Sequence, residues 1–286
     1  MAILVLEPPY DILYAHPRDN GVWSPAPGRP TIEQLECTIM GGTNVRFLGS
    51  GDTFGSGGRF HTCIHVCSED ATFLIDCGAS SLIAMKRFGV DPSSIDAVLV
   101  THLHGDHFGG IPFLVLDALL VSRRTRPLTL AGPPGLEGRV RDTMEALFPD
   151  SSRVRRRFEL EFVELSEGEA IGIGALTVTP YGVMHPSGAP AYALRIGCGG
   201  RVISYSGDTE WTDSLLSAAQ GADLFICEAY YFEKKVPYHL DYRTLMDHRS
   251  ELGCRRLILT HMSDDMLGRL GDVEAEWAED GKSLTL

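Results

Sequence analysis

Residues 98–110 read VLVTHLHGDHFGG, so an apolar segment runs directly into three histidines and an aspartate. Crowding imidazole rings and a carboxylate costs desolvation and mutual repulsion unless a positive charge lies between them. In an extended segment His102 and His104 project to the same side, whereas Asp106 and His107 fall on the following turn and can face a second point nearby. The stretch therefore predicts a metal site with two centres.

Three further strand-like segments also end at a potential metal ligand. They end at Asp76, Asp208 and His261. Catalytic groups gather where strands pass into loops, because the sheet holds the backbone while the loop frees the side chain to reach a cleft. We therefore expect these strand ends to contribute to the same site as residues 98–110.

Strand-like and helix-like patterns alternate through most of the chain. Strands are expected at 44–50, 62–66, 72–76, 97–102, 127–132, 158–165, 176–181, 191–197, 201–208, 224–229 and 256–261, and helices at 80–89, 111–122, 135–148, 213–220 and 243–253. Strand-rich halves with interleaved helices predict two packed sheets with helices outside, an α/β architecture.

The first 39 residues differ from the rest of the chain. They contain six prolines and show no sustained period of 2 or 3.6, so we expect an N-terminal extension at 1–39 and one domain at 40–286. No apolar run approaches the roughly 20 residues that span a bilayer. The initial AILVL is too short, and lacks the positive flank, for a secretory signal. We therefore expect a cytoplasmic protein without a membrane partner.

The formal net charge of −13 argues against a protein that coats nucleic acid or an anionic membrane with its whole surface. Two basic clusters, at 122–126 and 153–157, run against this trend. We interpret them as solvated faces. The composition leaves a homodimer open.

The ligand pattern resembles that of the metallo-β-lactamase fold. THLHGDHFGG (101–110) contains the HxHxDH signature, and His185 in YGVMHP, Asp208 in SGDT and His261 in LTHMS follow in the family's order. The resemblance covers about residues 44–262 and implies a four-layer αββα sandwich. It also implies a ligand assignment: His102, His104 and His185 for the first metal, Asp106, His107 and His261 for the second, Asp208 as the bridge, and Asp76 as a support that binds no metal.

Imidazole and carboxylate ligands make zinc the expected ion, although manganese or iron would fit the same set. Two divalent ions that share a hydroxide favour hydrolysis of an ester, amide or phosphodiester. Redox members of the fold carry a glutamate within the signature, whereas this chain keeps His104. The resemblance therefore implies a hydrolase.

Four segments resemble ribonuclease Z and the small phosphodiesterases: LGSGD (48–52), SYSGDT (204–209), CEA (227–229) and LILTHMS (257–263). We therefore expect phosphodiester cleavage through a metal-bridging hydroxide. A tRNA-processing enzyme carries a long arm between its third metal histidine and the bridging aspartate, but only 22 residues separate His185 from Asp208. Endonuclease action at tRNA 3′ ends is accordingly the second interpretation, and RNA is a disfavoured substrate. A thioesterase or lactonase is the third interpretation, and the intact ligand set argues against a non-catalytic binding module.

The same resemblance implies further catalytic residues beside the ligand Asp106. His239 in YHLD, assisted by Glu228, would stabilise or protonate the leaving oxygen, although Cys227 stands where the ribonuclease Z motif has histidine. The glycine-rich segment 49–58, GSGDTFGSGG, lacks the Gly-Lys-Ser/Thr of a P-loop, and no helix is expected after it. We interpret it as a tight loop beside the metal cleft.

Overall fold

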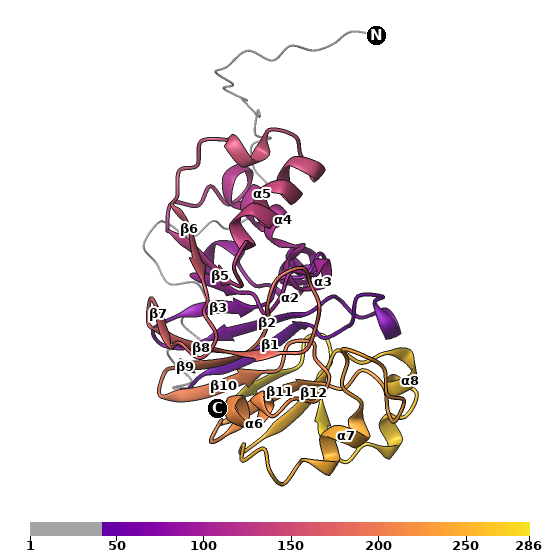
Figure 1. Cartoon of the computed structure of the whole chain (residues 1–286). Coiled ribbons are helices and arrows are strands. Elements are labelled where there is room, and N and C mark those ends of the chain that lie inside the picture. The colour runs from indigo at the N-terminus through magenta and orange to yellow at the C-terminus, as the bar shows by residue number, and fades with distance from the viewer. Residues whose placement is uncertain (1–41) are drawn as a thin grey trace, which may run out of the picture. The chain divides into compact units, whose positions relative to one another are not determined.

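Two β-sheets packed face to face, each covered by helices on its outer side, make up residues 42–286, the part of the chain that this computed structural model describes (Figure 1). This arrangement confirms the expected αββα sandwich. The expected extension at 1–39 lies outside the described residues. No helix within 42–286 is both long enough and apolar enough to cross a bilayer.

The first sheet contains seven strands in the described residues. Its order is β14 (Ser283–Thr285), β1 (Asn44–Gly49), β2 (Cys63–Cys67), β3 (Thr72–Ile75), β4 (Ala97–Leu99), β5 (Leu128–Gly132) and β6 (Leu160–Glu164). Strands β3 to β6 are parallel, whereas β14, β1, β2 and β3 pair antiparallel. The helices of this half are α2 (Ser81–Phe88), α4 (Ile111–Leu120) and α5 (Leu136–Leu147), and buried side chains of all three join those of the sheet in one apolar cluster.

The second sheet also contains seven strands within 42–286. Its order is β13 (Glu276–Trp277), β12 (Leu257–Thr260), β11 (Leu224–Glu228), β10 (Arg201–Tyr205), β9 (Ala191–Cys198), β8 (Leu176–Val183) and β7 (Ile171–Ile173). Helices α6 (Ser214–Ala219) and α7 (Tyr242–Asp247) cover its outer face. The remaining short elements are α3 (Gly105–Phe108), α8 (Asp264–Leu267) and the 3₁₀ turns η1 (Ser56–Gly58), η2 (Pro92–Ser94), η3 (Ser151–Arg153) and η4 (Leu270–Asp272).

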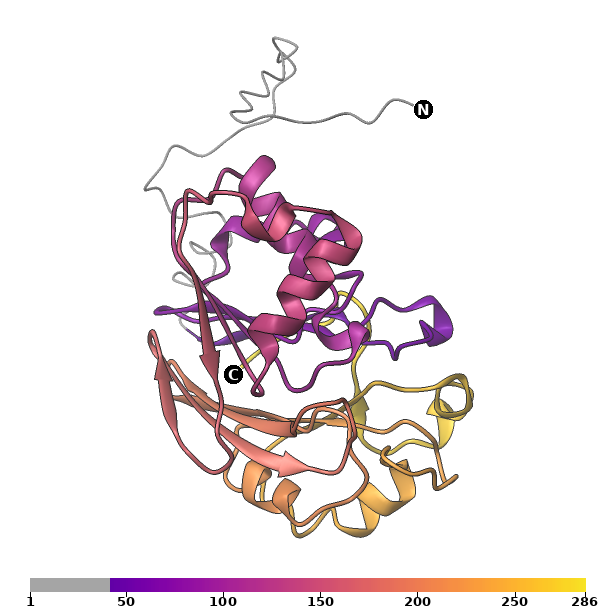
Figure 2. The same cartoon turned by 45° about the horizontal axis from the view of Figure 1, so that its top comes forward.

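The central core lies between the two sheets, which face each other in both views (Figure 2). Phe47 and Phe73 of the first sheet and Ile196 and Ile226 of the second belong to it and are fully buried. Burying each such side chain stabilises the fold by about 1.5–3 kcal/mol. The core therefore holds the two sheets, and the loops at their ends, in a defined arrangement.

Three parts of the fold differ from the expectation. Strand β7 (Ile171–Ile173), for which we expected no strand, forms the edge of the second sheet beside β8. The helix expected at 243–253 ends at Asp247, because only Leu252 of residues 248–252 is buried and another helical turn would gain little packing. The C-terminal residues, for which we expected no strand, add one edge strand to each sheet: β14 pairs antiparallel with β1 and β13 pairs parallel with β12.

The C-terminal segment also anchors the loop that follows β1. Asp280 Oδ1 accepts hydrogen bonds from the backbone N–H and the hydroxyl of Ser50, both at 2.9 Å, and Oδ2 accepts one from the N–H of Phe60 at 2.8 Å. We expect Asp280→Ala to lower the free energy of unfolding by about 2 kcal/mol, because bonds to a charged group are lost and their donors are part-buried. Urea denaturation measures this loss.

Glu279→Ala provides the matched control, since it removes the same charge from an exposed neighbouring side chain. It should change the unfolding free energy by less than about 0.5 kcal/mol. Equal effects of the two substitutions would contradict the anchoring role of Asp280.

Candidate metal centre

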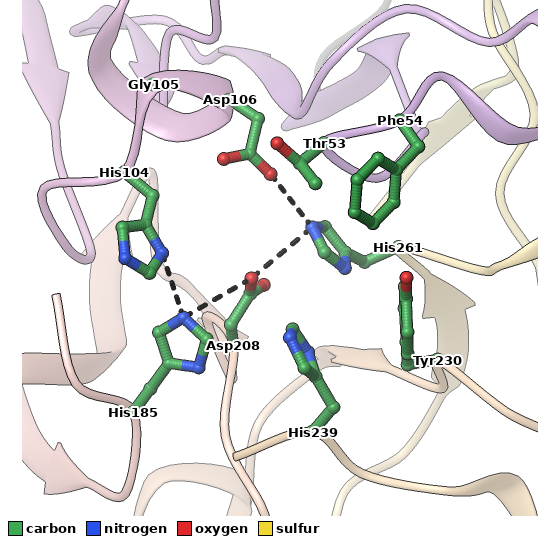
Figure 3. A pocket seen from close by; sticks show the side chains of 10 residues that line it. All are labelled: Thr53, Phe54, His104, Gly105, Asp106, His185, Asp208, Tyr230, His239 and His261. Carbon is green, nitrogen blue, oxygen red and sulfur yellow. Dashed lines mark hydrogen bonds and ion pairs between the residues drawn. The ribbon is translucent and has the colours of Figure 1, made fainter. Parts of the chain in front are cut away.

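The structure brings all the expected site residues together at one end of the sandwich, around a cavity of about 350 Å³. Figure 3 shows six of them facing its interior. The residues are His102, His104, Asp106, His107, His185, Asp208, Glu228, His239 and His261. They come from segments far apart in the sequence that the two sheets place side by side.

His102, His104 and His185 form the first ligand group. His104 immediately precedes α3, and His185 follows β8. Nδ1 of His104 lies 3.0 Å from Nε2 of His185. The side chain of His102 is fully buried, yet its Nε2 has no hydrogen-bond partner among the described residues. A buried nitrogen without a partner is costly unless it has another ligand, so this group fits a cation.

Asp106, His107, Asp208 and His261 form the second group. Nε2 of His261 lies 3.3 Å from Nε2 of His107 and 3.3 Å from Oδ2 of Asp106. Ligand atoms at the usual zinc distances in a tetrahedral site lie about 3.3 Å apart. These spacings therefore suit a bound metal ion.

Asp208 lies between the two groups. Its Oδ2 is 3.3 Å from Nε2 of His107 in the second group and 3.8 Å from Nε2 of His102 in the first. Its Oδ1 is buried and makes no hydrogen bond within residues 42–286. A carboxylate with one oxygen near both groups and one unpartnered oxygen can serve both groups, which is the position that the resemblance implies for a bridging residue.

Contacts behind the ligands set which ring nitrogens face the site. Nδ1–H of His107 donates to Oδ2 of Asp76 at 2.7 Å, and Asp76 Oδ1 accepts from the N–H of Thr101 at 2.8 Å. Nδ1–H of His185 donates to the carbonyl of Tyr238 at 2.8 Å. This tautomer assignment follows from the hydrogen bonds and leaves Nε2 of both rings free to bind a metal.

Two of the residues expected at the site from the sequence have backbones in the left-handed region. Asp76 has φ 59° and His261 has φ 56°. A non-glycine residue there costs roughly 1–3 kcal/mol and persists only where the surrounding structure holds it. The fold therefore accepts strain at Asp76 and at the candidate ligand His261, a pattern typical of functional sites.

Neighbouring histidines favour the ionised form of the two carboxylates in the donor set. Burial opposes the ionised form of Asp208, but His107 and His261 outweigh this effect and hold the pKa of Asp208 well below its usual value. Burial likewise opposes ionisation of Asp106, and His107 and His261 lower its pKa. Two ionised carboxylates among imidazole nitrogens make a donor set that suits divalent cations.

His239 and Glu228 form a pair beside the ligands. Nδ1–H of His239 donates to Oε2 of Glu228 at 3.0 Å, and Oε1 of the fully buried Glu228 accepts from the N–H of Thr209. Burial lowers the pKa of His239, but the hydrogen bond and charge of Glu228 prevail and raise it. The His239 ring stacks on Tyr230 with centroids 4.5 Å apart and lies 5.0 Å from the His185 ring. The pair therefore presents an imidazole to the cavity.

Sequence reasoning missed Tyr230 and Tyr238 at this site, and it expected the loop 49–58, which carries Phe54, beside the metal cleft without giving Phe54 a role. Tyr230 and Phe54 line the cavity, and the backbone carbonyl of Tyr238 orients His185. Tyr230 stands two residues after Glu228, and Tyr238 directly precedes His239. Their closeness to expected residues was the available signal, but only the folded loops show what they contact.

A model of the family described as anti-Pycsar protein Apyc1 matches residues 43–279. The chain belongs to this family. It is also 31% identical to the uncharacterized protein Rv1339 of Mycobacterium tuberculosis, across 82% of this chain and 83% of the relative.

Other relatives carry the name ribonuclease Z. The ribonuclease Z of Agathobacter rectalis is 27% identical, across 85% of this chain and 98% of its own. The crystal structure of the short form of human tRNase Z has the same fold, with a TM-score of 0.68, 24% identity, and coverage of 84% of this chain and 98% of that one. These matches confirm the resemblance to the metallo-β-lactamase fold and its ribonuclease Z and phosphodiesterase branch. With the donor set above, this Apyc1-family chain is a metal-dependent hydrolase.

Proposed function

We propose that the protein hydrolyses phosphodiester bonds with two divalent metal ions, and that these ions are zinc. The arrangement of seven donor residues in two groups that share Asp208 carries this proposal. His102, His104 and His185 would hold one ion, and Asp106, His107 and His261 the other. Manganese or iron would fit the same nitrogen and oxygen donors.

Divalent ions held by these residues would lower the pKa of a bound water molecule and would neutralise charge that develops on the phosphoryl oxygens. The protein's own groups have separate tasks. Asp76 and the carbonyl of Tyr238 orient the rings of His107 and His185. His239 donates Nδ1–H to Glu228, and in its protonated form it would offer Nε2–H to a leaving oxygen.

A small phosphodiester is favoured over a tRNA precursor, even though several relatives are named ribonuclease Z. The segment between His185 and Asp208 is largely taken up by β9 and β10, which leaves no arm at this point of the chain. The net charge of −13 also disfavours a large polyanion. Cleavage of tRNA 3′ ends therefore remains the second candidate function.

A substrate panel on metal-loaded protein tests the proposal. It compares bis(p-nitrophenyl) phosphate, a cyclic nucleotide, a thioester, a lactone and a tRNA precursor. We expect kcat/KM for the best small phosphodiester to exceed that for the thioester and the lactone by at least tenfold, a barrier difference of about 1.4 kcal/mol. A tenfold preference for the thioester or lactone would overturn the proposal, and a preference for the tRNA precursor would select the second candidate.

A further inference from the structure

Glu210 contacts the residue that precedes each of two site histidines. Its backbone N–H donates to the carbonyl of Met184 at 3.4 Å, and Met184 directly precedes His185. Its Oε2 accepts a hydrogen bond from the N–H of Tyr238 at 3.2 Å, and Tyr238 directly precedes His239. Glu210 therefore joins two segments that are far apart in the sequence, directly beside the histidine that each contributes to the cavity.

The segment that carries Glu210 is fixed on both sides along the chain. Before it, Thr209 donates its hydroxyl to the carbonyl of Glu210 at 2.6 Å and its N–H to the carboxylate of Glu228. After it, the ring of Trp211 stacks on that of His248, with centroids 3.9 Å apart and an angle of 9° between the planes. The backbone around Glu210 is therefore held independently of the Glu210 side chain.

Tyr238 depends on contacts from outside its own loop because its backbone is strained. Its φ of 70° lies in the left-handed region, where a non-glycine residue costs roughly 1–3 kcal/mol and persists only if the surrounding structure holds it. Its N–H is bound to Glu210, and its carbonyl accepts Nδ1–H of His185 at 2.8 Å. The conformation of Tyr238 therefore sets the position of the acceptor for His185 and the direction in which the chain enters His239.

The described residues that line the cavity do not include Glu210, so its carboxylate acts from behind the site. We propose that Glu210 is a positioning residue, which orients His185 and His239 through the backbone of Tyr238. This inference rests on the proposed function only for its effect on turnover. Groups that orient metal-binding histidines typically contribute about 10- to 100-fold to metal affinity or activity. Because Glu210 acts through an intervening residue, we expect an effect at the lower end of this range.

The tautomer of His185 in the metal-free protein tests this inference without turnover. Long-range ¹H–¹⁵N spectra should show His185 protonated on Nδ1 in the wild-type protein and as a mixture of both tautomers in Glu210→Ala. Calorimetric titration with zinc should show about tenfold weaker binding of one of the two equivalents in this variant. Binding of the other equivalent should change by less than about twofold, because only the first ligand group contains His185.

Two conservative variants separate the position of the carboxylate from its charge. Glu210→Gln keeps an acceptor oxygen for the N–H of Tyr238 but loses the charge, so it should keep the wild-type tautomer and zinc affinity. Glu210→Asp keeps the charge but withdraws the carboxylate by one methylene group, so it should behave like Glu210→Ala. Glu233→Ala removes an exposed charge from the loop that contains Tyr238, and as the control it should change neither property.

Kinetics on metal-loaded protein connect the inference to the reaction. Glu210→Ala should lower kcat on the best small phosphodiester about tenfold and leave KM within about twofold, since Glu210 does not line the cavity. An unchanged tautomer and zinc affinity in Glu210→Ala, or an equal loss in Glu210→Gln or Glu233→Ala, would overturn the positioning role. A wild-type protein that cleaves no phosphodiester, but whose tautomer and zinc affinity respond to Glu210→Ala, would overturn the proposed function alone.

Discussion

Asp208→Ala should abolish turnover, with a loss of at least about 10³-fold in kcat, and should weaken binding of both metal ions. The reason is the central position of the carboxylate, whose Oδ2 lies 3.3 Å from Nε2 of His107 and 3.8 Å from Nε2 of His102. Its removal leaves each group without its shared oxygen and removes a negative charge that offsets two cations. Elemental analysis after reconstitution with zinc should give two equivalents for the wild-type protein and one or fewer for the variant.

Asp117→Asn is the matched control for this substitution. Asp117 on α4 is also buried, but it lies away from the cavity, and its carboxylate pairs with Lys86 of α2 at 3.0 Å. The Asp117→Asn variant should bind two equivalents of metal and keep full kcat, even if it melts at a lower temperature than the wild-type protein. Full activity of Asp208→Ala, or two tightly bound ions in that variant, would refute the bridging role.

The central part of the fold could be predicted because its signals are local. Most strands between 44 and 261 alternate or run apolar over three or more residues, and residues 98–110 contain four candidate ligands close together. Local patterns of this kind survive folding since they reflect which face of each element is buried. The resemblance then supplied the order of the distant ligands, which spacing alone could not give.

Three of the four edge strands, β7, β13 and β14, could not be predicted, because their signal is too short. Strand β13 has two residues and β14 has three. Asn44 of β1 pairs with Thr285 of β14, although almost the whole described chain separates the two residues in sequence. Such strands owe their conformation to the sheet edge that they meet, so tertiary contact outweighs local propensity.

Cys227 shows how the structure resolves a departure from a motif. Successive residues of a strand point to opposite faces, so Cys227 and Glu228 of β11 have different surroundings. Cys227 packs in the apolar cluster beneath α6 and α7, whereas Glu228 contacts His239 and Thr209. Replacement of the motif histidine by Cys227 therefore leaves the position of Glu228 intact. The sequence alone did not show which of the two faces the cavity.

The loop before His239 explains why the position of its side chain could not be predicted from the sequence. Residues 234–238 form a loop in which Tyr238 has φ 70°, and no periodicity reports where such a loop places the next side chain. In the structure this turn directs the Tyr238 carbonyl to His185 while His239 reaches Glu228. One short loop therefore serves a ligand and a catalytic candidate together.

His239→Ala should keep both metal ions yet lose about 10²-fold or more in kcat on a phosphodiester with a poor leaving group, such as a cyclic nucleotide. An alkoxide that departs from phosphorus needs a proton or a nearby positive charge, and protonated His239, held by Glu228 at 3.0 Å, would supply either. The loss on methyl p-nitrophenyl phosphate should be much smaller, because nitrophenolate leaves with little protonation. Glu228→Gln, which removes the charge and leaves one acceptor oxygen for the N–H groups of His239 and Thr209, should show the same dependence on the leaving group with a smaller loss. Equal losses on both esters would make His239 a binding residue. A fall in metal content would make it a ligand instead, since its ring nitrogen lies within 4.8 Å of donor atoms of His185 and Asp208.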